Sequence, residues 1–69
     1  MHEANVIRVE GRVTEVLSER LYRVELVNGH RFLGFVTARD LAAGMRFAPG
    51  ETVQAAMSPL DLSKARLRK

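Results

Sequence analysis

The surplus of positive charge lies near the end of the chain, and the type of the cationic residues indicates a binding chemistry. Residues 61–69 carry four of them against one acid, whereas residues 1–60 hold seven basic and seven acidic side chains. The four are Lys64, Arg66, Arg68 and Lys69. Nine of the 11 basic residues are arginine, whose planar fork pairs with phosphates and stacks on bases. This tilts the expectation toward a nucleic-acid partner, with a solvated basic tail as the alternative.

The residue types needed for catalysis or metal binding are not brought together by any motif. Neither His2 nor His30 has a serine or aspartate nearby in a nucleophile motif, and the glycines are too scattered for a phosphate loop. Glu10 and Glu15 are oddly spaced, so a regular strand would point them to opposite faces. Without cysteine there is no thiolate metal site. We expect a protein that is not an enzyme and holds no metal or cofactor.

The length and composition bound the class of protein. A chain of 69 residues is expected to form one domain, 1–69, and its 46% apolar and 28% charged residues are typical of a folded protein. It shows no apolar run of 18 residues and no signal-peptide profile. We expect a soluble, cytoplasmic protein that is monomeric when free and has no membrane partner.

Apolar residues alternate with polar ones along the first half of the chain, which predicts strands. Residues 7–14 alternate with period two, and the pattern resumes over residues 22–26. Gly11 lies inside the first run and suggests a bulge or sharp bend, as a strand needs when it serves two sheets of a small barrel.

Asn28-Gly29 separates two alternating runs and predicts a hairpin with two possible registers. A two-residue turn would pair Tyr22 with Phe35 and bury Phe35. A three-residue loop, with Gly29 in the left-handed conformation, would pair Tyr22 with Gly34 and leave Phe35 on the outer face. We favour the second register because it also places opposite charges across from each other and sets a large ring over a glycine.

The second half of the chain predicts a short helix and two further strands. Thr37 is a suitable N-cap, Asp40 takes the third helical position, and Gly44 ends the helix. Residues 53–57 alternate after a Pro-Gly turn, and residues 65–68 form a short segment that suits a closing strand. The predicted fold is all-β: a five-stranded OB-fold barrel with one short helix between strands 3 and 4. Small SH3-like barrels usually lack that helix.

Two stretches are similar to signature segments of bacterial translation initiation factor one. Residues 22–30, Tyr-Arg-Val-Glu-Leu-Val-Asn-Gly-His, resemble that family's aromatic-Arg-Val-Glu-Leu-x-Asn-Gly-His. Residues 58–66, Ser-Pro-Leu-Asp-Leu-Ser-Lys-Ala-Arg, resemble its Thr-Pro-Tyr-Asp-Leu-Ser-Lys-Gly-Arg. The spacing between them matches without gaps, and weaker similarity covers roughly the whole chain.

The resemblance implies a function in translation initiation. Such a factor binds the decoding (A) site of the small ribosomal subunit, contacts ribosomal RNA and a neighbouring ribosomal protein, and acts with the other two initiation factors to direct initiator tRNA to the P site. The positions that match basic residues or the histidine of the family imply RNA contacts for all but one of the residues that we expect at the site. The exception is Phe35, whose ring on the outer face adds a surface for base stacking. The rRNA-binding residues that we expect are Arg23, His30, Phe35, Arg39, Arg46, Lys64 and Arg66.

The chain also departs from the family pattern. The helix region usually carries several bases, but here only Arg39 keeps the charge and Asp40 opposes it. Phe35 replaces a family histidine, Leu60 a tyrosine, and Ala65 a glycine. Fewer phosphate contacts predict weaker and less salt-sensitive RNA binding. A divergent second copy of the factor would explain these changes.

Two other functions compete with this interpretation. A general single-stranded RNA-binding barrel, such as an RNA chaperone, usually presents several aromatic rings on one face, and this chain has only four aromatic residues in total. A barrel that docks on a protein is suggested by the neutral first sixty residues and by Leu33 and Phe35 on the outer face. Strong salt dependence of binding would separate an RNA binder from a protein-docking barrel.

Overall fold

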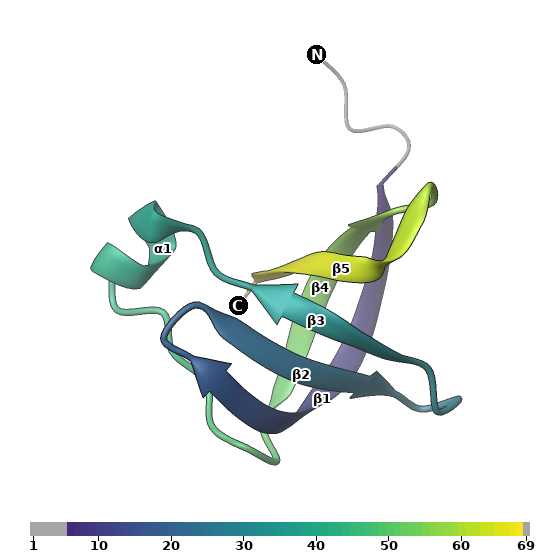
Figure 1. The fold of residues 1–69 in the computed structure, drawn as a ribbon, viewed down its shortest axis with the longest axis horizontal. Coiled ribbons are helices and arrows are strands. Elements are labelled where there is room, and N and C mark those ends of the chain that lie inside the picture. The colour runs from purple at the N-terminus through teal and green to yellow at the C-terminus, as the bar shows by residue number, and fades with distance from the viewer. Residues whose placement is uncertain (1–5, 69) are drawn as a thin grey trace.

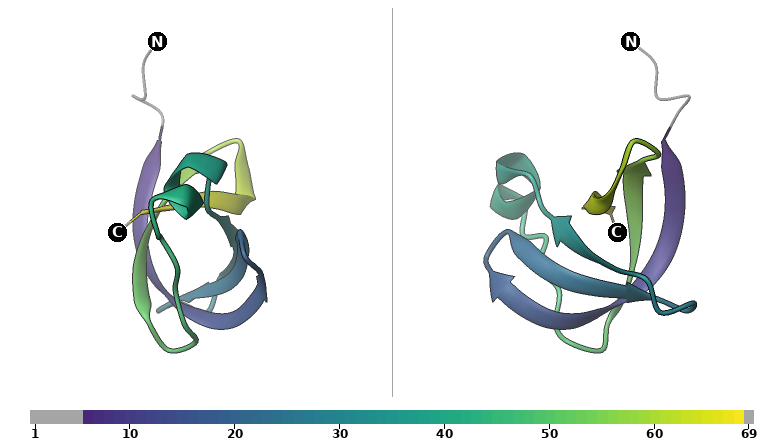
Figure 2. Two further views of the ribbon diagram at one scale, coloured as in Figure 1. Left: turned by 90° about the vertical axis from the view of Figure 1, so that its left-hand side faces the viewer. Right: turned by 45° about the vertical axis from the view of Figure 1, so that its right-hand side comes forward.

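The computed structural model describes residues 6–68, which form a closed barrel with the strand order β1-β2-β3-β5-β4 (Figures 1 and 2). The elements are β1 (Ile7–Ser18), β2 (Leu21–Leu26), β3 (Arg31–Phe35), α1 (Ala38–Ala42), β4 (Thr52–Ser58) and β5 (Asp61–Arg68). All neighbouring strands are antiparallel except β3 and β5, which are parallel. This confirms the all-β, five-stranded OB-fold with one short helix between strands 3 and 4. Within residues 6–68, the helix α1 has five residues and is far too short to cross a bilayer.

Strand β1 serves both sheets of the barrel, as its glycine suggested. Gly11 lies opposite Leu26 of β2 on one side and opposite Val53 of β4 on the other. A Cβ added at Gly11 would lie 2.7 Å from Cγ1 of Val24, so the close approach of β1 to β2 at this point depends on the missing side chain.

The irregularities of β1 lie beyond Gly11, between Val13 and Glu15 and again nearer the strand's end. The first of them overturns the prediction that Glu10 and Glu15 point to opposite faces. Because the extra residue shifts the alternation, Glu15 comes to lie opposite Arg23, on the outside of the barrel. Glu10 is also exposed, so both carboxylates face solvent.

The β2–β3 hairpin adopts the three-residue loop. Tyr22 lies opposite Gly34 and Val24 opposite Phe32, while the amide of Leu26 donates to the carbonyl of His30 at 2.8 Å. Gly29 has a φ of 92°, the left-handed conformation that this loop requires. The favoured register is therefore confirmed, and Phe35 lies on the outer face.

The remaining local predictions hold except at β5. Thr37 caps α1 by accepting a hydrogen bond from the amide of Asp40 at 3.1 Å, and Gly44 follows with a φ of 94°. Strand β5 begins at Asp61, four residues before the predicted start. Its early part is held by the pairing of Asp61 with Ser58 of β4 and of Lys64 with Leu33 of β3, and by hydrogen bonds from Ser63 to the Asp61 carboxylate.

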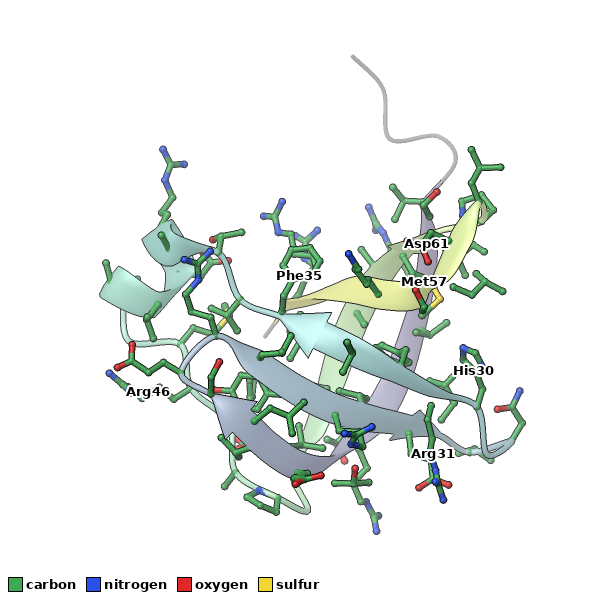
Figure 3. All side chains as sticks on the ribbon, viewed as in Figure 1. His30, Arg31, Phe35, Arg46, Met57 and Asp61 are labelled. Carbon is green, nitrogen blue, oxygen red and sulfur yellow. The ribbon has the colours of Figure 1, made fainter. Side chains whose placement is uncertain are left out.

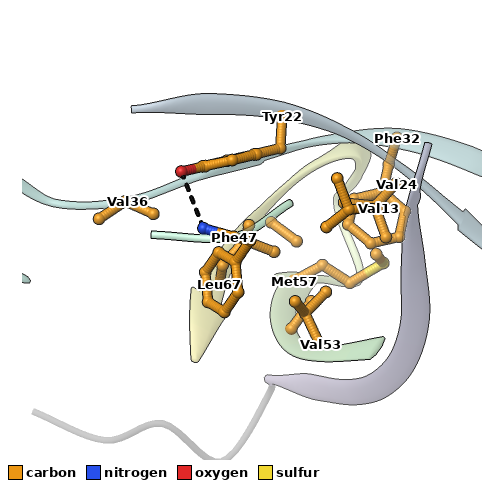
Figure 4. Close-up of a cluster of buried hydrophobic side chains, with 11 residues drawn as sticks. Val13, Tyr22, Val24, Phe32, Val36, Phe47, Val53, Met57 and Leu67 are labelled. Atoms are coloured by element: carbon orange, nitrogen blue, oxygen red, sulfur yellow. Dashed lines mark hydrogen bonds between the residues drawn. The ribbon is translucent and has the colours of Figure 1, made fainter. Parts of the chain in front are cut away.

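The core fills the inside of the barrel (Figure 4). Its buried residues are Val13, Tyr22, Val24, Phe32, Val36, Phe47, Val53, Ala55, Met57, Ala65 and Leu67. The Tyr22 ring packs edge-on against Phe47, with the centroids 5.6 Å apart, and its hydroxyl accepts the Phe47 amide hydrogen at 3.3 Å. Gly34 makes room mainly for Leu67, since a Cβ there would lie 2.5 Å from a Leu67 methyl carbon.

Candidate nucleic-acid interface

The parallel pairing of β3 with β5 joins three of the predicted site residues. Phe35 lies opposite Arg66, and Leu33, two residues earlier on β3, lies opposite Lys64. Alternation along β5 turns Ala65 and Leu67 into the core and leaves Lys64, Arg66 and Arg68 exposed. We call these three cations the β5 ridge. Because Phe35 lies opposite Arg66, the half-buried Phe35 ring and the ridge share the outer surface of β3 and β5.

Arg23 borders this surface on the other side of β3, opposite Leu33. Its Nε atom lies 3.2 Å from Oε1 of Glu15, and the two side chains are 46% and 59% exposed. An ion pair this exposed contributes little to stability. It does place a carboxylate beside a guanidinium that was predicted to face RNA.

His30 has a contact that the sequence did not reveal. Its Nε2 atom lies 3.0 Å from the carbonyl oxygen of Leu62, and its ring stacks on Phe32 with the centroids 6.3 Å apart. The imidazole therefore links the hairpin loop to the beginning of β5. His30 remains exposed, so its ring can contact a partner while it makes this link.

Arg39 and Arg46 are not part of the same cluster. Arg39 is exposed on α1 and Arg46 is exposed in the loop that follows. In Figure 3, Arg46 and His30 lie at opposite sides of the molecule, whose longest extent is 29 Å. A ligand that touched all seven predicted residues would have to cover most of one side of the barrel. The structure thus groups Arg23, Phe35 and the ridge, and separates the other three.

A second feature that sequence reasoning missed is a cleft of about 260 Å³ beside the ridge. Its walls are Asp40, Met45, Arg66, Leu67 and Arg68, so it lies between the helix region and the end of β5. Asp40 brings a negative charge to this edge. The cleft could not be foreseen because α1 and β5 are adjacent only after the barrel has closed.

The fold and the surface define a small OB barrel that presents three cations along β5 beside one half-buried aromatic ring. No family model matches the chain. Among solved structures, the chain is similar to translation initiation factor one from the Wolbachia endosymbiont strain TRS of Brugia malayi. The TM-score is 0.77 and the identity 29%, over 97% of this chain and 79% of that one. This confirms the resemblance to translation initiation factor one and supports a role as a translation initiation factor.

Proposed function

We propose that this protein is a translation initiation factor that binds the decoding (A) site of the small ribosomal subunit. There it contacts ribosomal RNA and a neighbouring ribosomal protein, and acts with the other two initiation factors to direct initiator tRNA to the P site. The observation that carries the proposal is the similarity to translation initiation factor one over 97% of the chain. The protein acts in the cytoplasm as a monomer and is not an enzyme.

The proposed mechanism is occupancy. A barrel that fills the decoding site excludes tRNA from it, so initiator tRNA is directed to the neighbouring position. The β5 ridge supplies charge to the RNA backbone, because Lys64 and Arg66 form no ion pair with any acid of the described residues. Phe35, half-buried beside Arg66, offers a ring to a displaced base, a contact that contributes about 1–3 kcal/mol in single-strand binders.

The aromatic residues disfavour a general single-stranded RNA-binding function. Three of the four rings, those of Tyr22, Phe32 and Phe47, are buried in the core. Phe35 is left as the one Phe or Tyr ring outside the core, whereas sequence-tolerant binders stack successive bases on several rings. Recognition must then depend on the shape of a folded RNA site together with backbone contacts.

Co-sedimentation with purified small ribosomal subunits, at two salt concentrations and with free single-stranded RNA as competitor, tests the proposal. We expect about one copy per subunit, weaker binding at high salt, and no displacement by the free RNA. The double variant Lys64→Gln/Arg66→Gln should lose binding. The control Arg12→Gln/Arg31→Gln removes two charges elsewhere and should retain it. Absence of binding at low salt, or equal loss in both variants, would refute the proposal.

A further inference from the structure

The outer face of the sheet formed by β1, β4 and β5 carries a row of residues that extends the β5 ridge. Arg8 of β1 lies opposite Ala56 of β4, and Ala56 lies opposite Arg66 of β5. Arg66 in turn lies opposite Phe35 of β3. The row therefore runs across the strands from a half-buried ring, over one arginine and a small residue, to a second arginine.

The spacing of this row suits a chain of phosphates. Strands in a sheet are about 4.8 Å apart, so the backbones at Arg8 and Arg66 are separated by about 10 Å. Ala56 between them has only a methyl group, so both guanidinium groups can reach over it to the same or to neighbouring phosphates. Neither arginine forms an ion pair within residues 6–68.

The charges around the row limit where an anionic chain can lie. Arg68 lies next to Gln54 on the same face, two residues along β5 from Arg66. Glu10 lies on the other side of Gln54, two residues along β1 from Arg8. Its carboxylate repels phosphates from that part of β1, which favours the line through Arg8 and Arg66 over a line closer to Glu10.

We propose that this face binds a single RNA strand. One base stacks on Phe35, and the sugar–phosphate backbone crosses β5 and β4 to reach Arg8. The proposal rests on the proposed function, since the RNA is a segment of the small ribosomal subunit. It adds Arg8 to the RNA-binding residues and extends the interface from β3 and β5 onto β1. Planar arginine forks spaced along a row in which Phe35, half-buried, is the one large apolar residue fit a phosphate backbone better than a protein surface.

The test compares Arg8→Gln with Arg12→Gln. Both residues are exposed on β1, both changes remove one charge, and neither side chain makes a hydrogen bond in the described structure. Arg12 lies four residues farther along the strand, opposite Thr52 and Glu25 and about 13 Å from Arg8. Affinity for small subunits is measured at several salt concentrations.

We expect Arg8→Gln to weaken binding about three- to tenfold, as for the net loss of one ordinary hydrogen bond at an exposed site. The slope of log affinity against log salt should fall by about 0.7, the value for one phosphate of a single strand. Arg12→Gln should change neither. If the two variants behave alike while the wild-type protein binds, this inference is overturned and the proposed function stands. If the wild-type protein does not bind subunits, the proposed function fails and this inference fails with it.

A label beside the row, two residues along β4 from Ala56, distinguishes RNA from an acidic protein at this face. The chain has no cysteine, so the Gln54→Cys variant has a single thiol. An RNA-cleaving iron chelate can therefore be attached at position 54 and nowhere else. Glu19→Cys, in the exposed β1–β2 turn, is the control. We expect cleavage of a short ribosomal RNA segment from position 54 and a different pattern from position 19. Weakened binding of Arg8→Gln without cleavage from position 54 would assign the face to a protein and overturn the inference.

Discussion

Replacing Gly34 with alanine would push a methyl group into space that Leu67 fills. The new Cβ would lie 2.5, 2.8 and 2.9 Å from Cδ2, Cγ and Cδ1 of Leu67, so the whole end of that side chain is in the way. Leu67 is fully buried and cannot turn out to solvent. The substitution must therefore move β5 relative to β3, where Gly34 lies opposite Ala65, between two cations of the β5 ridge.

The expected cost follows from two opposing effects. Overpacking a filled core costs about 1–3 kcal/mol. Replacing glycine with alanine restricts the unfolded chain and recovers about 0.4–1 kcal/mol. We expect Gly34→Ala to lower the free energy of unfolding by about 1–2 kcal/mol. In a domain of this size each kcal/mol lowers the Tm by about 4–8 °C.

Urea unfolding followed by circular dichroism measures the effect, and a shortened neighbour provides the control. Leu67→Val removes one methylene and should cost about 1 kcal/mol alone. In that background Gly34→Ala should cost less than in the wild-type protein, by about 0.5 kcal/mol or more, because the two residues are in contact. A Gly34→Ala protein as stable as the wild type, or a cost that Leu67→Val does not reduce, would refute the reasoning.

Substitutions at three other positions each test a single feature. Tyr22→Phe leaves the buried amide of Phe47 without its acceptor and should cost about 1–3 kcal/mol, measured by urea unfolding; an unchanged midpoint would contradict this. Gly29→Ala meets no atom within 4 Å but must adopt a φ of 92°, so we expect a loss of about 1–2 kcal/mol and a smaller loss for Gly29→Asn. Hydrogen bonds from the side chain and backbone of Ser63 lower the pKa of Asp61 below its ordinary 3.8. The Asp61 carboxylate therefore stabilises the fold above about pH 4 and loses this effect as the pH falls through its lowered pKa, so the stability difference between wild type and Asp61→Asn should vanish in acid.

The parts of the fold that the sequence predicted correctly are those that depend on local chemistry. The hairpin register follows from a glycine that must be left-handed, and the α1 cap from a hydroxyl three residues before its amide donor. The beginning of β5 was wrong because it depends on a non-local partner. Residues 61–64 show no alternation of their own and become a strand by pairing with β3 and β4.

The site was predicted less completely because it depends on which strands become neighbours. Arg8 alternates outward with the rest of β1, but its place in line with Arg66 requires the β1–β4–β5 sheet order. The ion pair of Arg23 requires the bulge between Val13 and Glu15, since without it Glu15 would face the interior. A bulge of this kind has no signal in the sequence beyond the break in alternation that it causes.

These neighbours also decide how much each cation can contribute to binding RNA. A phosphate that approaches Arg23 meets a guanidinium whose charge is already opposed by Glu15 at 3.2 Å, and the carboxylate repels it. Arg66 has no such partner within residues 6–68 and lies beside Phe35, so it can offer its full charge next to a ring. Motif position alone would rank Arg23 and Arg66 together. The structure instead favours β5 as the centre of the interface, with Arg23 as a weaker contact at its border.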